Sequence, residues 1–362
     1  MRDIIIATGT LGGGGAERVF LNLANEMSEQ GMRVHVLVTS TRKVQSYPLS
    51  QGIILDSCTS EKKNKAVKII DKFVQIHRYL KNHPGSAVIS FFPDVSAYCV
   101  FASVGCHVRT IVSERNDPRS IPEKKAMRKI RDAAFSRADV CVFQTQDAMN
   151  YFPEKVRKKG YIIGNPIRAE DFPSPRAIRE RDKIILAVGR IVPQKNFLLL
   201  LKAWEKIEKK YPDYVVQIYG NQNSHGGIYT EELQQYIEGH NLQGRVELMG
   251  FSNDIYSVMN RAAIYVSPSN FEGMSNTMLE AMAMGLPSIV TDCPVGGARS
   301  VIESGRNGIL VPIQDVDALA SAMDELLQNE SMREQFSQES VQIRKTLSIH
   351  QIAQEWIQLI QE

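Results

Sequence analysis

The chain has 362 residues, of which 43% are hydrophobic and 23% are charged, as in soluble globular proteins. This length exceeds what one ordinary core supports and predicts two domains of roughly 150–200 residues each. No apolar run approaches the roughly 20 residues of a transmembrane helix, and the N-terminus leads straight into a predicted strand, so we expect no signal peptide and a cytoplasmic location.

The cysteine content and the charge distribution further limit the kinds of site and partner that the protein can have. The five cysteines contain no C-x-x-C pair, which argues against a disulfide framework or a zinc site. The net charge of +3 hides an asymmetry: residues 1–170 carry 26 Lys and Arg against 16 Asp and Glu (+10), and the remainder carries 17 against 24 (−7). The basic half predicts contact with an anionic partner or surface.

The first half of the chain alternates buried strands with helices. A strand over 4–8, a glycine loop over 12–15, a helix over 16–30 and a strand over 33–39 predict a βαβ opening. The glycines allow close approach of a ligand, or they are plain turn chemistry. The second strand lacks the terminal acidic residue that binds a dinucleotide ribose, which disfavours hydride chemistry with NAD. Further strands are predicted over 87–92, 110–113, 140–144 and 160–163.

Polar residues follow two of these strands. Asp94 comes after the strand over 87–92, and the run Glu114-Arg115-Asn116-Asp117-Pro118 comes after the strand over 110–113. Ligands of open α/β sheets bind at the carboxyl ends of the strands, so both places are candidate sites. Asp94 is equally explained as a helix N-cap.

Two basic segments of the first half are candidates for contact with phosphate or with an acidic membrane. In the helix predicted over 61–82, one apolar stripe either packs on the core or rests on a membrane, with lysines elsewhere on the helix. The residues of this stripe are Ala66, Ile69, Ile70, Phe73, His77 and Leu80. The second segment holds eight basic residues: Arg115, Arg119, Lys124, Lys125, Arg128, Lys129, Arg131 and Arg137.

A second α/β set follows a segment without hydrophobic periodicity. Residues 168–183 are charged and interrupted by prolines, which predicts an interdomain linker. The strands predicted beyond it cover 184–188, 214–219, 246–249, 262–267 and 287–291.

The stretch 270–282 joins a predicted strand to a helix and carries two glutamates. Glu272 lies in the loop and Glu280 in the helix. A small-residue loop at a helix N-terminus suits a diphosphate, and flanking carboxylates can accept hydrogen bonds from sugar hydroxyls. The stretch therefore predicts a nucleotide-sugar site. Thr277 and Glu280 also have the spacing of a capping box, so a purely structural role for Glu280 stays open.

With Arg190 and Lys195 after the strand over 184–188, this stretch resembles the donor site of glycosyltransferase family 4. The resemblance covers the whole chain and rests on four motifs in order. These are Gly14-Gly15-Ala16-Glu17-Arg18, Gly189-Arg190…Gln194-Lys195-Asn196, Glu272-Gly273…Asn276…Glu280-Ala281-Met282-Ala283 and Asn307-Gly308-Ile309-Leu310-Val311.

The resemblance implies the α/β GT-B fold, with two Rossmann-like domains whose parallel sheets face across a cleft. Residues 1–170 are expected to form the acceptor-binding domain and residues 180–345 the nucleotide-sugar-binding domain. A C-terminal helix over 346–362 is expected to pack back on the first domain.

The resemblance also implies a retaining, metal-independent glycosyltransferase with a UDP-sugar as donor substrate and no cofactor. Cations at Arg190 and Lys195 would neutralise the leaving diphosphate, because charge develops there in the transition state. The family histidine is absent from the loop over 113–116, and Arg115 or Asn116 is its expected replacement. The candidate catalytic residues are Glu272, Arg190, Lys195, Asp94 and Arg115. The candidate donor-binding residues are Gly14, Gly15, Gly189, Gly220, Phe251, Gly273, Met274, Ser275, Asn276, Thr277 and Glu280.

Within those roles, Glu272 is expected to bind sugar hydroxyls, Glu280 the ribose, Phe251 the base and Asp94 the acceptor hydroxyl. The run over 113–118 resembles bacterial transferases of polysaccharides and lipid-linked oligosaccharides. It implies transfer of a hexose or N-acetylhexosamine to a polyprenyl-diphosphate-linked glycan in lipopolysaccharide or capsule synthesis, peripherally on the inner membrane. A nucleotide-sugar epimerase and a non-catalytic nucleotide-sugar- or glycan-binding protein stay open as alternatives. No nucleic-acid partner is expected.

Overall fold

The computed structural model describes residues 2–12, 15–40 and 48–362, which form two compact α/β units. The first unit runs to Pro166 and resumes over Leu347–Glu362, and the second unit is Ile167–Thr346. The predicted fold class, two Rossmann-like domains with parallel sheets, is confirmed. No helix within the described ranges is long and apolar enough to cross a membrane.

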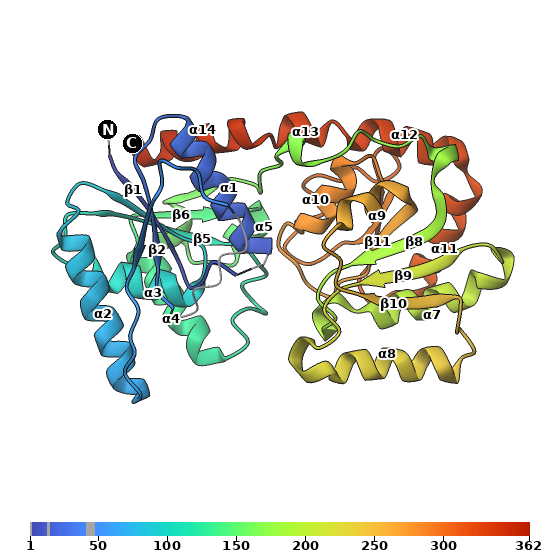
Figure 1. Ribbon diagram of the computed structural model, residues 1–362, viewed down its shortest axis with the longest axis horizontal. Coiled ribbons are helices and arrows are strands. Elements are labelled where there is room, and N and C mark those ends of the chain that lie inside the picture. The colour runs from blue at the N-terminus through green and yellow to red at the C-terminus, as the bar shows by residue number, and fades with distance from the viewer. Residues whose placement is uncertain (1, 13–14, 41–47) are drawn as a thin grey trace. The chain divides into compact units, whose positions relative to one another are not determined.

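The first unit contains a seven-stranded parallel sheet in the order β3-β2-β1-β4-β5-β6-β7 (Figure 1). Successive side chains of a strand point to opposite faces, so Ile4 and Ile6 join one core while Ile5 and Ala7 join another. Both faces are therefore apolar, which explains the continuous hydrophobic runs. The strands are β1 (Ile4–Thr8), β2 (Val34–Val38), β3 (Ile54–Ser57), β4 (Ala87–Ser90), β5 (Arg109–Glu114), β6 (Val140–Phe143) and β7 (Gly160–Ile162).

Helices cover both faces of this sheet. Helices α1 and α14 pack together on one face, and α2, α3 and α4 lie side by side on the other (Figure 1). The helices of the unit are α1 (Gly15–Glu29), α2 (Lys65–Lys81), α3 (Pro93–Ala102), α4 (Lys125–Arg137), α5 (Gln146–Asn150), α6 (Glu154–Arg157) and α14 (Ile349–Gln361).

The C-terminal helix α14 belongs to the core of the first unit. Its Trp356 side chain is fully buried and meets the Phe91 ring edge-on, with 5.5 Å between ring centroids. The Arg2 Nη1 atom donates to the Ile360 carbonyl at 2.8 Å, which ties the two chain ends together. The buried residues of the helix are Ile349, Ile352, Ala353, Trp356, Leu359 and Ile360.

Helix α2 buries only part of the apolar stripe predicted for it. Ile76 and Leu80 are buried, and His77 Nδ1 bonds the Ala102 carbonyl at 2.8 Å, so the second half of the helix packs on the unit. The first half does not, and Ile70 is 63% exposed. The prediction of a core-packed stripe is thus right for the second half and wrong for the first. Large apolar side chains exposed on the helix are Val67, Ile69, Ile70 and Val74.

The second unit contains a six-stranded parallel sheet in the order β10-β9-β8-β11-β12-β13. The fully buried Trp204 of α7 lies in a core that also takes in α8, α11 and α12. The strands are β8 (Asp182–Val188), β9 (Val215–Tyr219), β10 (Val246–Gly250), β11 (Ala262–Ser267), β12 (Ser288–Thr291) and β13 (Ile309–Val311). The helices are α7 (Phe197–Ile207), α8 (Ile228–Gly239), α9 (Ile255–Arg261), α10 (Asn276–Ala283), α11 (Val316–Gln328), α12 (Glu330–Ser340) and α13 (Ile343–Thr346).

The segment predicted as an interdomain linker begins at the boundary of the second unit, and its Arg181 side chain packs on that unit. The Arg181 guanidinium is buried and donates to five backbone carbonyls near the ends of α9 and α10. Carbonyls at a helix end lack intrahelical partners, so one arginine satisfies two helix termini. The charged character of the segment therefore reflects buried hydrogen bonding as well as solvation.

Candidate active site at the carboxyl edge of the second sheet

Two loops of the second unit leave the carboxyl ends of neighbouring central strands. Strand β8 leads into the loop over 189–196, and β11 leads into the loop over 268–275. The strand order reverses between β8 and β11, and open parallel sheets bind their ligands at such a switch point. The predicted cationic loop and the predicted acidic loop are therefore neighbours.

The side chains of Lys195 and Glu272 meet in an ion pair. Lys195 Nζ lies 2.6 Å from Glu272 Oε1, and the two side chains are 12% and 16% exposed. Ser269 Oγ donates to the same oxygen at 3.2 Å. Burial by itself lowers the pKa of Lys195, but the carboxylate of Glu272 outweighs it, and the pKa is raised. Lys195 is thus held as a cation beside the Glu272 side chain, and both side chains are partly exposed to a ligand.

Arg190 adds a second cation to the same loop. Its side chain is exposed, and its Nη2 atom donates to Gln194 Oε1 at 3.4 Å. An exposed guanidinium next to a partly buried ammonium is suited to a phosphate or diphosphate.

The helix after the acidic loop begins one residue before the predicted capping box. The N-cap of α10 is Ser275, and its side chain makes no capping bond. Glu280 is the fifth residue of the helix and is 6% exposed, so the Thr277–Glu280 capping box is wrong. The Thr277 Oγ1 atom instead contacts Tyr265 OH at 3.0 Å and Ser275 Oγ at 3.1 Å.

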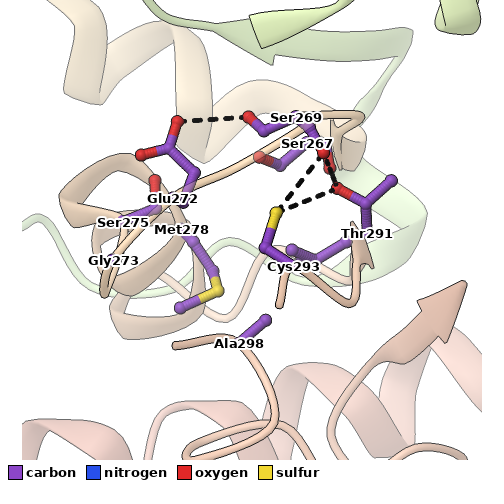
Figure 2. Close-up of a pocket in the computed structure, with 10 residues that line it drawn as sticks. Ser267, Ser269, Glu272, Gly273, Ser275, Met278, Thr291, Cys293 and Ala298 are labelled. Carbon is purple, nitrogen blue, oxygen red and sulfur yellow. Dashed lines mark hydrogen bonds between the residues drawn. The ribbon is translucent and has the colours of Figure 1, made fainter. Parts of the chain in front are cut away.

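A small pocket lies under the acidic loop, with Glu272, Ser275 and Met278 on one side and Thr291 and Cys293 facing them (Figure 2). Thr291 Oγ1 donates to the Ser269 carbonyl at 2.6 Å, and Cys293 Sγ donates to it at 3.4 Å. Burial raises the pKa of the Cys293 thiol to about 12, so the sulfur is a neutral hydrogen-bond donor at neutral pH.

Two glycines place loop backbones in direct contact. A Cβ atom on Gly297 would lie 1.9 Å from the Gly273 carbonyl oxygen, and one on Gly220 would lie 1.9 Å from the Gly189 carbonyl oxygen. Gly220 therefore supports the cationic loop, and Gly297 supports the acidic loop. Gly297 is a site-shaping residue that sequence reasoning missed, although the Gly296-Gly297 pair after β12 was its signal.

The other predicted donor-binding residues differ in exposure. Gly273, Met274 and Ser275 are buried, whereas Asn276 and Thr277 are half-buried. Phe251 is 75% exposed in the turn after β10. In the first unit, Gly15 is the exposed first residue of α1, and Gly14 lies outside the described residues.

The guanidinium of Arg115 contacts backbone carbonyls and aromatic rings of the first unit. Its Nη1 atom donates to carbonyls over 163–164 and to Asn165 Oδ1, and its Nε and Nη2 atoms are buried. The guanidinium carbon lies over the Phe91 and Trp356 rings, at 5.0 and 5.4 Å from their centroids. Desolvation lowers its pKa to about 9, with partial compensation by Glu114. Most of the guanidinium's contacts lie within the first unit, and the replacement of the family histidine by Arg115 or Asn116 stays a prediction.

The loop after β5 is organised by Glu114 and Arg131, a pair that sequence reasoning missed. Glu114 accepts hydrogen bonds from the backbone N–H groups of the next two residues, and Arg131 Nη1 reaches its carboxylate at 3.2 Å. Arg131 is fully buried and also donates to the carbonyls of Pro118 and Ile121. Arg131 is therefore no part of an exposed basic surface on α4. Nothing in its sequence neighbours distinguishes it from the exposed lysines.

Asp94 lies in the first turn of α3, whose N-cap is Phe92, so the N-cap alternative for Asp94 is wrong. Its charge acts on Lys72 of α2 and on Tyr98 of its own helix. Burial lowers the pKa of Lys72, and Asp94 partly offsets this. The carboxylate thus lies beside a basic helix at the carboxyl edge of the first sheet.

Comparison with known families decides the class of protein. The model for glycosyl transferases group 1 matches residues 169–342, and the model for Glycosyltransferase Family 4 matches residues 13–171. The chain belongs to glycosyltransferase family 4. The family and the GT-B fold expected from the sequence are thus confirmed, and this glycosyltransferase is an enzyme that transfers glycosyl groups.

Curated relatives resemble the glycosyltransferase over its full length. It is 25% identical to GalNAc-alpha-(1->4)-GalNAc-alpha-(1->3)-diNAcBac-PP-undecaprenol alpha-1,4-N-acetyl-D-galactosaminyltransferase of Campylobacter jejuni, over 100% of this chain and 99% of that protein. It is 24% identical to an uncharacterized glycosyltransferase of Haemophilus influenzae, over 95% of each chain.

Solved structures share the fold at lower identity. Anabaena HepE in complex with UDP and glucose superposes with a TM-score of 0.83 at 16% identity, over all of both chains. Sucrose-phosphate synthase from Thermosynechococcus elongatus gives a TM-score of 0.84 at 18% identity, over 100% of this chain and 98% of that chain.

Proposed function

We propose that this glycosyltransferase moves a hexose or N-acetylhexosamine from a UDP-sugar to a glycan on polyprenyl diphosphate, with retention of configuration and without a metal. The observation that carries the proposal is the Lys195–Glu272 pair beside Arg190 at the switch point of the second sheet. The relatives' names support the acceptor: the Campylobacter enzyme acts on an undecaprenol-linked glycan. The HepE complexes support the UDP-sugar donor.

In the reaction, the bond between the anomeric carbon and the diphosphate oxygen breaks, and its electron pair leaves with UDP. The acceptor hydroxyl oxygen bonds the anomeric carbon, and its proton passes to the leaving diphosphate oxygen. Lys195 and Arg190 stabilise the charge that develops on the diphosphate, which is why no metal is needed in this proposal. Glu272 accepts hydrogen bonds from the sugar, Glu280 from the ribose, and Asp94 contacts the acceptor hydroxyl.

A donor-panel assay read by mass spectrometry tests the proposal. We expect one UDP-sugar to be hydrolysed slowly alone and transferred to a prenyl-diphosphate acceptor, with equal rates in EDTA and in excess magnesium. The Glu272→Ala variant should lose activity by about 100-fold or more, in line with the removal of a transition-state contact. Full activity in that variant would refute the site, and loss of activity in EDTA would refute the metal-free step.

The same assay separates the two alternatives. A nucleotide-sugar epimerase converts the donor when no acceptor is present, and a glycan-binding protein binds UDP without turnover on any acceptor. The cations of Arg190 and Lys195 and the Glu272 side chain favour transfer over both.

We further propose that the enzyme acts peripherally on the cytoplasmic membrane face through helix α2. Val67 and Ile70 are exposed on its first half, Val74 is exposed just past its middle, and Lys65 is exposed at its start. Such a surface suits a shallow position among anionic headgroups. Wild type should float with anionic liposomes at low salt, and V67S/I70S should not. Equal flotation of the two proteins would exclude α2 as the contact.

A further inference from the structure

Four hydrogen bonds join the cationic loop to the acidic loop next to the Lys195–Glu272 pair. The Asn270 N–H donates to the Gln194 carbonyl at 2.8 Å, and Asn270 Nδ2 donates to the Pro193 carbonyl at 3.0 Å. Asn196 Nδ2 donates to Asn270 Oδ1, and Gln194 Nε2 donates to the Phe271 carbonyl, both at 3.0 Å. We infer that Gln194, Asn196 and Asn270 form a loop clamp that positions Lys195 against Glu272 for catalysis.

Asn196 makes its hydrogen bond to Asn270 from a backbone conformation that is locally unfavourable. Its backbone is left-handed, with φ 47° and ψ 46°, a conformation that L residues other than glycine adopt at a cost. Asn196 is also the N-cap of α7, a position where an asparagine side chain ordinarily accepts a bond from the helix backbone. Here the side chain makes no capping bond and reaches the other loop instead. Strain and a forgone cap at one residue indicate that the cross-loop contact has a function.

The side-chain amide of Asn270 both donates and accepts hydrogen bonds across the two loops. Its amide nitrogen donates to a carbonyl of the cationic loop while its amide oxygen accepts from Asn196 and, at 3.5 Å, from Gln314 Nε2. A carboxylate cannot donate, and an apolar side chain can do neither. The asparagine therefore fixes the position of the two loops relative to each other.

The residues of the loop clamp lie close in sequence to both members of the ion pair. Lys195 lies between Gln194 and Asn196, and Glu272 follows Phe271, whose carbonyl accepts from Gln194. When a donor diphosphate engages Lys195 and a sugar engages Glu272, the direct bond between the two side chains is lost. The loop clamp then keeps the two groups at the spacing that the donor spans. This role rests on the proposed function.

A double-mutant cycle tests the loop clamp. Asn270→Ala removes the central amide, and Asn196→Gly removes the other side chain while tolerating φ 47°. Asn241→Gly is the matched control, because Asn241 is left-handed at φ 56° and exposed before β10. For each protein, kcat and KM are measured with the active UDP-sugar, UDP affinity by calorimetry, and stability by thermal unfolding.

Each clamp variant should lower kcat by about 10- to 100-fold, as expected when reacting groups are misplaced by about 1 Å. The double variant should be no slower than the slower single variant, because both remove the same contact. UDP affinity should weaken in each single variant and should be no weaker in the double variant than in the weaker single variant. The melting temperature should stay at or above the wild-type value. The control should match wild type in every measurement.

Single variants with wild-type kcat and UDP affinity would overturn the loop clamp, and so would losses that multiply in the double variant. A loss of activity that follows a lower melting temperature would also overturn it, since the residues would then act on folding alone. A wild-type protein that transfers no sugar refutes the proposed function separately, and the calorimetric cycle still decides the loop clamp.

Discussion

The contact between Gly297 and Gly273 allows a quantitative prediction for one methyl group. In Gly297→Ala the new Cβ would lie 1.9 Å from the Gly273 carbonyl oxygen, whereas real Cβ contacts essentially never fall below 3.0 Å. The neighbouring atoms are all backbone, so the acidic loop and the loop of Gly297 must separate by at least about 1 Å. A displacement of that size at a reacting group costs about 100-fold in rate, or about 2.7 kcal/mol in activation free energy.

The measurement is kcat for the best UDP-sugar, with thermal unfolding of the same samples. We expect a loss of about 1–3 kcal/mol in stability from the clash alongside the slower turnover. Gly239→Ala is the control, because a Cβ there meets no atom within 4 Å and the glycine lies in helix α8. If Gly297→Ala keeps kcat within about twofold of wild type, the placement of the acidic loop by this glycine is refuted.

Three further predictions concern charged groups. Lys195→Met should lower kcat by about 100-fold or more while the chain stays folded, as measured by single-turnover kinetics, and an unchanged rate would remove Lys195 from the mechanism. Arg181→Met should cost about 3 kcal/mol in urea unfolding because five buried carbonyls lose their donor, whereas the exposed Arg179→Met should change little. Burial raises the pKa of Glu114 to about 7, and Arg131 partly offsets this effect. Between pH 4.5, the ordinary pKa of a glutamate, and pH 7, the folded chain therefore holds a proton on Glu114 that the unfolded chain has released. Stability should therefore fall as the pH rises between these values, and Glu114→Gln should show a smaller slope in melting temperature.

The fold was predictable because its central strands are buried on both faces. Strands such as β1, β4 and β11 therefore appear as short apolar runs that end at glycine or polar residues. Strand β3 was missed because it is an edge strand with exposed Ile54 and Leu55, so its sequence shows no buried run. Edge strands have only one neighbour, and burial pattern alone does not identify them.

The candidate site was predictable for those residues that directly follow the end of a strand in the sequence. Arg190, Lys195 and Glu272 follow strand ends, and the parallel topology brings their loops together. Arg131 was misjudged, and the surroundings of Arg115 were missed, because their partners are distant in sequence: the guanidinium of Arg115 meets Trp356, and that of Arg131 meets Glu114. The sequence alone does not show whether a charged side chain is solvated or is buried against a partner that is distant in the chain.

The return of α14 to the first unit gives the protein a built-in pair of optical probes. The chain has two tryptophans, and each is fully buried in a different unit, Trp204 in the second and Trp356 in the first. Indole emission shifts when the ring meets water, so Trp356→Phe and Trp204→Phe each leave a reporter for a single unit. Denaturation curves of the two variants would then show whether the units unfold in one cooperative step or in succession.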